Sequence, residues 1–99
     1  MPNAKPKPPV NLPATVEAAV RLLHGLVPDD EQTRIAFMAE SELPALDFGL
    51  GQWVRNSLGL WGTNADLLAD TGEAHPDDAS TVIVRAFWIE LKNGLPRVH

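Results

Sequence analysis

The chain has 99 residues, a formal net charge of −5 at pH 7 and no cysteine. Its length fits one domain, and the lack of cysteine excludes disulfide bonds, cysteine nucleophiles and thiolate metal sites. An apolar content of 44% is ordinary for a globular protein, so a modest core can form.

The distribution of charge argues against binding to nucleic acid. Lys5 and Lys7 lie near the N-terminus, so residues 11–99 carry 6 basic and 13 acidic side chains, a net charge of −7. Nucleic acids are bound through lysines and arginines that neutralise phosphates. We therefore expect no nucleic-acid partner. The acidity favours solubility and leaves a basic protein partner open.

No segment is typical of export or membrane insertion. Residues 1–13 contain lysines but lack the apolar stretch of a signal peptide. No apolar run approaches the roughly 20 residues of a membrane span. We expect a soluble, cytoplasmic protein without a membrane partner.

The N-terminal part of the chain predicts a tail and then a helix. Residues 1–13 contain five prolines, which is typical of a flexible, partly polyproline-II tail outside the core. Thr15 is a good N-cap, and Pro28 should end the first helix near Val27. The apolar residues of this helix recur at helical spacing: Val16, Ala19, Val20, Leu23, Leu26 and Val27.

A second helix is expected directly after the first. Asp29 and Gln32 have the spacing of a capping box, so this helix should run from Asp29 to about Glu42. Its apolar stripe is weaker, and Leu43-Pro44 should end it.

The stretch FGLGQWVRNSLGLWGTN, residues 48–64, predicts a third helix and a turn. Apolar side chains at steps of three and four favour a helix from about Phe48 to Leu58. Gly59 has the position of a left-handed glycine that closes a helix, with residues 59–64 as the turn after it. The side chains expected on one face are Leu50, Trp53, Val54, Leu58 and Trp61.

Two more helices complete the prediction. Thr63 or Asn64 can cap a short helix over residues 65–70, which Gly72 ends. Pro76 suits the first position of a last helix, which should run to about Asn93 and pack centrally. Its β-branched residues leave a strand open as an alternative for residues 81–91. The fold expected is all-α, a compact bundle of four to five short helices. The domain spans residues 14–95, and residues 96–99 form the C-terminal end.

The tryptophans and the Arg-Asn pair are candidate binding residues. Trp53 and Trp61 fit a core stripe, but tryptophan is also enriched in binding hot spots. Arg55 and Asn56 flank that stripe. Arg55 can pair with Asp47, Asp77 or Asp78, or it can bind an anionic ligand with its planar fork. The pairing within the chain is the favoured interpretation.

His75, Asp77 and Asp78 form the cluster closest to an enzyme site. Imidazole and carboxylates are ligands for zinc or iron, and histidine is an acid–base group near neutral pH. No HExxH pattern supplies further ligands, and a helix start explains the same residues. We therefore predict no metal, no cofactor and no catalytic residue.

Taken together, these motifs resemble those of a family of small bacterial domains of unknown function. The resemblance rests on the order FGLGxWxRNxxGLW, a following Asn, and HPDDAS, and it covers roughly residues 12–92. It implies a compact helical fold and brings no activity, cofactor or substrate. The matching residues are Gly49, Gly51, Trp53, Arg55, Asn56, Gly59, Leu60, Trp61, Asn64, His75, Asp77, Asp78 and Ser80.

Two functions follow as hypotheses. The first is a small acidic interaction module without catalytic activity, adaptor-like or inhibitor-like, with a protein partner or a second copy of itself as a homodimer. The second is a ligand-binding or metal-binding protein, or an enzyme, that uses a polar cluster. The residues of that cluster are Arg55, Asn56, His75, Asp77 and Asp78. Asn64 could join it, either in a buried hydrogen-bond network or in the lining of a pocket.

Overall fold

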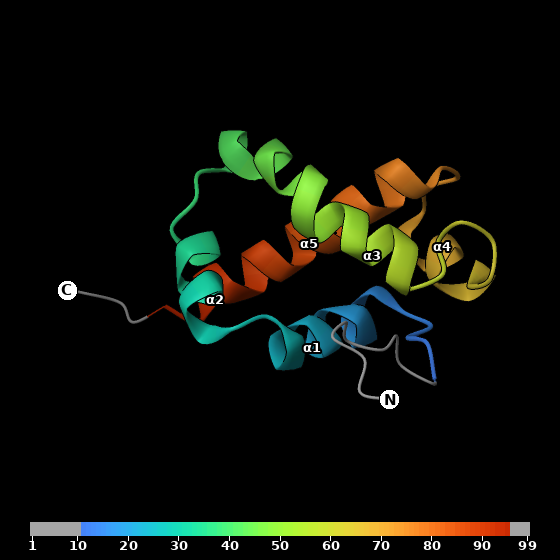
Figure 1. Ribbon diagram of the computed structural model, residues 1–99, viewed down its shortest axis with the longest axis horizontal. Helices are drawn as coiled ribbons and strands as arrows, with labels where there is room; N and C mark the ends of the chain where they lie inside the picture. The colour runs from blue at the N-terminus through green and yellow to red at the C-terminus, as the bar shows by residue number, and fades with distance from the viewer. Residues whose placement is uncertain (1–10, 96–99) are drawn as a thin grey trace, which may run out of the picture.

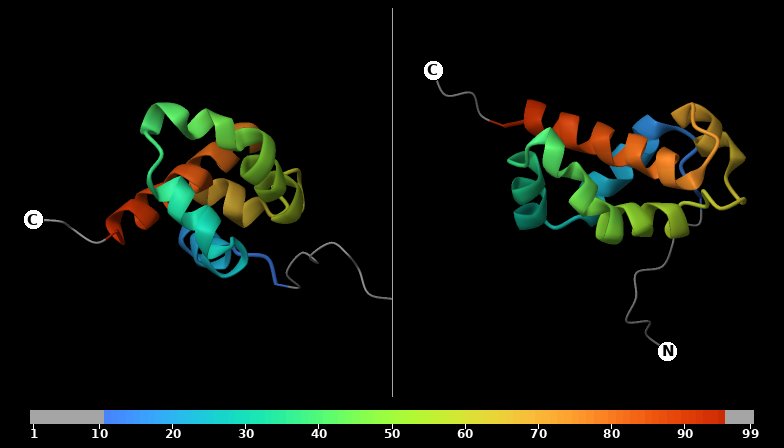
Figure 2. Two further views of the ribbon diagram at one scale, coloured as in Figure 1. Left: turned by 60° about the vertical axis from the view of Figure 1, so that its left-hand side comes forward. Right: turned by 90° about the horizontal axis from the view of Figure 1, so that it is seen from above.

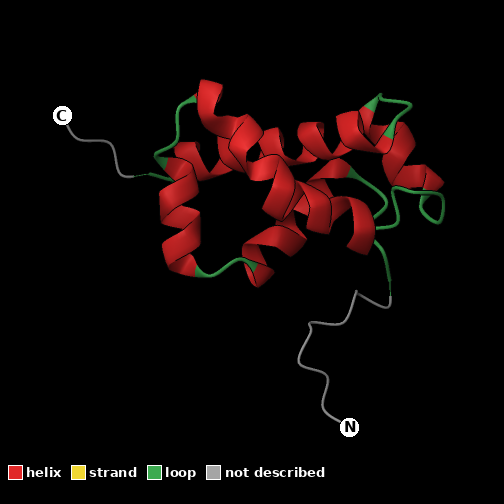
Figure 3. Ribbon diagram, turned by 45° about the horizontal axis from the view of Figure 1, so that its top comes forward, coloured by secondary structure: helices red, strands yellow, loops and turns green. Residues whose placement is uncertain are grey.

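The computed structural model describes residues 11–95, which fold as helices joined by loops (Figure 1). Its elements, in chain order, are α1 (Val16–Leu26), α2 (Asp29–Ala36), the 3-10 helix η1 (Glu40–Leu46), the π-helical turn η2 (Asp47–Gly51), α3 (Gln52–Ser57), α4 (Ala65–Thr71) and α5 (Pro76–Asn93). Figure 3 shows no strand in this part of the chain. The all-α prediction is confirmed, and residues 81–91 are helical. Most of the expected N-terminal tail, and residues 96–99, lie outside the described residues.

α5 is the central helix of the bundle. It contacts each of the other helical elements within residues 11–95. Figures 1 and 2 show α5 running through the middle, with α1 and α3 on different sides and α2 and α4 toward opposite ends. Its inward side chains Ala79, Ile83 and Phe87 are fully buried. The expectation of a central last helix is confirmed.

The N-terminus of α5 follows from its sequence. His75 is the N-cap, and its Nδ1 accepts a hydrogen bond from the Asp77 N–H at 3.1 Å. Pro76 occupies the first turn, where a missing N–H costs nothing. Asp77 and Asp78 lie at the positive end of the helix dipole. The β-branched run after them stays helical because packing of the buried face outweighs its weak helix propensity.

The core joins apolar side chains from nearly every element. Burying them supplies most of the free energy that stabilises a domain of this size. The largest fully buried side chains are Phe87, Leu23, Ile35, Leu58, Leu60, Leu67, Ile83 and Val54.

The second helix begins at Asp29 as predicted, but its cap and its C-terminal end differ from the prediction. α2 begins at Asp29, but its N-cap is Pro28, and no side chain caps it. The Gln32 amide instead donates to the carbonyls of His24 and Val27, at 2.9 and 2.8 Å. The predicted capping box is therefore wrong. Gln32 ties α2 back to the end of α1.

The predicted extension of this helix to Glu42 is also wrong, and a tertiary contact explains why. Trp88 on α5 donates its Nε1–H to the Met38 carbonyl at 2.9 Å, and Met38 is buried. The chain leaves α2 at Ala36 and resumes helical backbone as η1. Pro44 lies inside η1 and does not end it. Proline removes a donor and clashes with the carbonyl four residues back, which fits the 3-10 geometry there.

The turn after α3 is built on Gly59. Its φ is +78°, the left-handed conformation predicted for it. The Gly59 carbonyl accepts hydrogen bonds from the N–H groups of Thr63 and Asn64, at 3.1 and 2.9 Å. Trp61 therefore lies in the turn, and the prediction that it shares a helical face with Trp53 is wrong.

Candidate functional site

Arg55 lies at the centre of the polar residues that the sequence singled out. It is buried, with 8% of its surface exposed. Its Nη1 donates to Asp47 Oδ1 at 2.7 Å and to Ser80 Oγ at 2.9 Å. Its Nη2 donates to the Asp47 carbonyl at 3.4 Å, and its Nε lies 3.3 Å from Asp77 Oδ1. All three nitrogens of the guanidinium therefore face acceptors of the same chain.

The local backbone brings Asp47 and Arg55 close together. In the π-helical turn, the Gln52 N–H bonds to the Asp47 carbonyl, five residues back. A Cβ at Gly51 would lie 3.1 Å from Asp47 Oδ1 and 3.4 Å from Arg55 Nη1. Ser80 Oγ also donates to the Asp77 carbonyl at 2.9 Å. These contacts fasten η2 and α3 to the first turns of α5.

A second group of the predicted residues gathers around Trp61. Its Nε1–H donates to Asn56 Oδ1 at 2.9 Å, and its ring meets the His75 ring edge-on at 6.2 Å between centroids. The ring remains 60% exposed. His75 Nδ1 accepts the Asp77 N–H and lies 3.7 Å from Asp77 Oδ2. The group joins the end of α3 to the start of α5.

Asn64 stands apart from both groups and has a structural position. It is buried, and its Nδ2 donates to the carbonyls of Pro13 and Leu58, at 2.8 and 2.9 Å. Its Oδ1 accepts the Leu67 N–H at 3.3 Å and caps α4. One side chain therefore links the N-terminal segment, the end of α3 and the start of α4.

The remaining two predicted residues lie elsewhere. Trp53 is half-buried against the core and lines a groove of about 460 Å³ between α1, α2 and η2. Asp78 is exposed, and its carboxylate forms no hydrogen bond or ion pair with residues 11–95. No three His, Asp or Glu side chains in that range lie close enough together to hold a metal ion.

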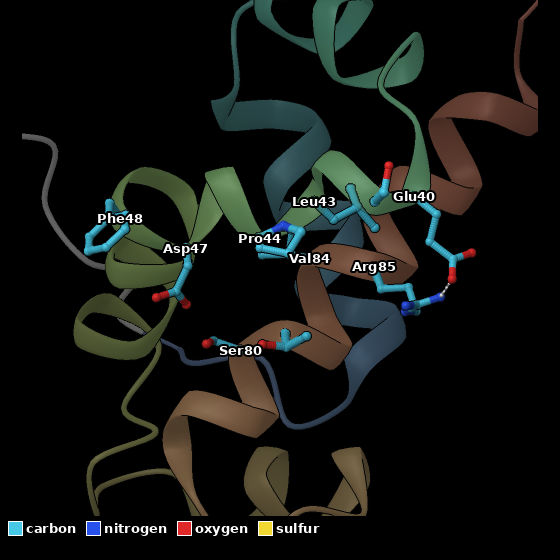
Figure 4. A pocket seen from close by; sticks show the side chains of 11 residues that line it. Glu40, Leu43, Pro44, Asp47, Phe48, Ser80, Val84 and Arg85 are labelled. Atoms are coloured by element: carbon cyan, nitrogen blue, oxygen red, sulfur yellow. Dashed lines mark ion pairs between the residues drawn. The ribbon is translucent and has the colours of Figure 1, made fainter.

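A groove beside Arg55 is lined by its partners Asp47 and Ser80 but not by Arg55 itself. Its volume is about 640 Å³, and it runs between η1, η2 and α5 (Figure 4). Apolar side chains of Leu43, Pro44 and Val84 line it, and Phe48 stands at one end with 85% of its surface exposed. Glu40 and Arg85 pair at the other end, at 3.2 Å.

Sequence reasoning missed this groove and one partner of the buried arginine, the Ser80 hydroxyl. Asp47 was named only as one of three candidate partners, and Ser80 was noted only within the HPDDAS motif. Phe48 was assigned to the start of a helix. The available signal was the pattern Asp47-Phe48 before Gly49 and Gly51, because a helical turn that directs Asp47 toward Arg55 directs the neighbouring side chain outward.

The fold and these contacts define a small helical domain whose buried polar groups form hydrogen bonds within the chain. The family described as "Domain of unknown function (DUF6794)" matches residues 12–91. The chain belongs to this family, which agrees with the expected resemblance to a family of unknown function. Its bacterial origin and the motif pattern stay predictions. Neither the curated proteins nor the solved structures include a significant match. No helix within residues 11–95 has both the length and the apolar character needed to cross a membrane.

Proposed function

We propose that this domain is a non-catalytic protein-interaction module, adaptor-like or inhibitor-like, that binds a partner through the groove beside Phe48. The observation that carries the proposal is the exposure of Phe48, 85% of whose surface faces solvent at the end of an apolar groove. Leaving a large aromatic side chain exposed to water is unfavourable compared with burying it. Phenylalanine is among the aromatic residues enriched in the buried centres of protein interfaces.

The groove has the composition of a small interface. Leu43, Pro44 and Val84 give it a largely apolar lining, with Ser41, Ser80 and Thr81 beside them, and its ends carry Asp47 and the Glu40–Arg85 pair. Interfaces commonly combine an apolar centre with a polar rim that fixes orientation. The occupant that fits is an apolar side chain from a segment of another protein, packed between Phe48 and Val84. A second copy of this chain is the competing occupant.

The alternative, a ligand site around Arg55, has less support. The guanidinium already donates to Asp47 and Ser80 and lies against Asp77. Binding an anionic ligand would require breaking these contacts, and stranding a buried charge costs several kcal/mol, on the order of 3–5.

The test places a photo-crosslinking phenylalanine analogue at position 48 in the cell that makes the protein. The matched control carries the same analogue at Phe37, which is 72% exposed and lies outside this groove. We expect one discrete crosslinked protein from position 48 and none from position 37. Adding Leu43→Ser to the groove floor should remove that product.

Three outcomes would overturn the proposal. They are equal products from both positions, no product from position 48, or a product that survives Leu43→Ser. A product with twice the mass of the chain would reject a foreign partner in favour of the homodimer.

A further inference from the structure

The arginine and lysine side chains of residues 11–95 all contact other side chains of the same chain. Each arginine in residues 11–95 pairs with a carboxylate: Arg21 with Glu17, Arg34 with Glu31, Arg55 with Asp47 and Asp77, and Arg85 with Glu40. The Lys92 ammonium lies over the Trp88 ring, 4.9 Å from its centroid. The surplus of acidic side chains therefore has no cation within this part of the molecule.

Part of that surplus lies at one end of the bundle, where one of the acidic side chains, Asp77, also pairs with Arg55. Residues 56–84 contain five acidic side chains and no lysine or arginine. The five acidic residues lie on α4, in the loop after it and at the start of α5, at the end of the bundle opposite α2 (Figure 1). Within the described residues, the carboxylates of Asp66, Glu73 and Asp78 have no hydrogen-bond or ion-pair partner. We call residues 61–78 the acidic end.

The acidic end also presents an aromatic face. Trp61 is held by its hydrogen bond to Asn56 and its contact with His75, yet most of its ring is exposed. A tryptophan face attracts an ammonium or guanidinium group, and nearby carboxylates add to the attraction. This surface is therefore complementary to a short basic segment.

The chain carries such a segment at the right place. Lys5 and Lys7 are the two cations of residues 1–10, which also contain four prolines. Leu12 and Pro13, near the start of the described residues, lie at this same end of the domain. Leu12 Cδ1 is 3.1 Å from where a Gly59 Cβ would lie, and the Pro13 carbonyl is bonded to Asn64.

The reach of the segment is sufficient. Lys7 precedes Leu12 by five residues, which span about 16 Å at the roughly 3.1 Å per residue of polyproline II. Trp61 follows Gly59 by two residues, at most about 7.6 Å between Cα atoms. Lys7 can therefore reach the Trp61 ring without any change in the body of the domain.

We propose that residues 1–10 dock on the acidic end, with a lysine ammonium over the Trp61 ring and the positive charge facing the carboxylates of α4 and α5. This contact is separate from the Phe48 groove, so neither proposal depends on the other.

A spin label tests the contact in the full-length chain. Because the chain has no cysteine, Asn3→Cys gives a single site for a nitroxide. The readout is the intensity of the three tryptophan indole N–H signals in a ¹⁵N spectrum. We expect the Trp61 signal to lose most of its intensity while the buried Trp88 signal keeps it.

Charge variants separate docking from mere proximity. Lys5→Gln with Lys7→Gln should restore much of the Trp61 signal, whereas Lys5→Arg with Lys7→Arg should leave it weak. Asp66→Asn with Asp78→Asn should also restore it. The matched control is Asp29→Asn with Asp30→Asn, which removes two first-turn carboxylates from α2 at the other end. This control should change nothing.

Equal Trp61 intensities in the glutamine and arginine variants would overturn the proposal. So would equal effects of the two Asp→Asn pairs. A mixed sample of labelled chain and isotope-enriched unlabelled chain gives the remaining outcome. Loss of the Trp61 signal in that sample would assign the contact to the segment of a second copy and reject docking within one chain.

Discussion

Arg55 is the one charged side chain of residues 11–95 that is buried. Its partners differ from it, because the side chains of Asp47 and Asp77 keep 45% and 60% of their surface exposed. A carboxylate left without its arginine can therefore regain water, whereas the arginine without its carboxylates cannot. Removing the carboxylates should therefore destabilise the domain more than removing the arginine does.

We expect Arg55→Met to lower the free energy of unfolding by about 2 kcal/mol, because it removes the charge-assisted hydrogen bonds to Asp47 and Ser80, although the carboxylates it leaves can regain water. The matched control, Arg85→Met, removes an exposed pair with Glu40 and should cost less than about 1 kcal/mol. Urea titration followed by circular dichroism measures both. Equal losses would show that Arg55 contributes no more than a surface cation.

Gly59 and Gly25 allow a second comparison at the scale of single residues. Gly59 has positive φ, and an added Cβ would lie 3.0 Å from Asn64 Cβ. Gly59→Ala should cost about 2 kcal/mol or more from backbone strain and crowding. Gly25 lies in α1 with open space around it, so Gly25→Ala should stabilise by about 0.5–1 kcal/mol. Thermal unfolding of both variants is the measurement, and a loss in both would contradict this account.

At the scale of elements, the sequence predicted best where local signals decide. Thr15 caps α1, Asn64 (one of the two expected candidates) caps α4, and α5 begins at Pro76, because caps and a first-turn proline act within a few residues. It failed for the end of α2, which depends on a hydrogen bond from Trp88 to Met38, 50 residues apart. No local pattern contains that contact.

The candidate site also combines features that local sequence predicts with features that depend on tertiary contacts. The pairing of Arg55 with carboxylates was anticipated from charge alone. The selection of Asp47 and Asp77 over Asp78 depends on how η2 and α5 lie against each other. The Phe48 groove, which crosses three elements, had no signal in any one of them.

Asn64 gives the prediction at this scale, since it connects three segments. Asn64→Asp keeps the acceptor that caps α4 but loses the donor to Pro13 and Leu58 and places a charge beside their carbonyls. We expect a loss of about 2–3 kcal/mol from unpaired buried groups. Asn56→Asp is the control, because that amide serves as an acceptor for Trp61 and should change stability by about 0.5 kcal/mol or less. Similar losses in both would mean that capping, not donation, is what Asn64 contributes.

At the scale of the whole molecule, like charges repel. Residues 11–95 carry 13 acidic and 5 basic side chains, and every arginine among them is already paired within the chain. We expect the midpoint of thermal unfolding to rise as sodium chloride increases from low concentration to about 0.15 M, where the screening length is about 8 Å. A midpoint that falls with salt would show that attraction within the ion pairs outweighs the general repulsion.

The π-helical turn at Asp47–Gly51 has a consequence for how this surface can change. Such a turn is an α-helix with one residue too many, and each residue of an α-helix advances it by about 100°. Gly49 lies in open space within it. Deleting Gly49 would rewind the turn and rotate the preceding backbone by about that angle, which would carry Asp47 away from Arg55 and swing Phe48 off its groove. Gly49 therefore fixes the orientation of Asp47 toward Arg55 and of Phe48 toward its groove. Its deletion would change both orientations at once.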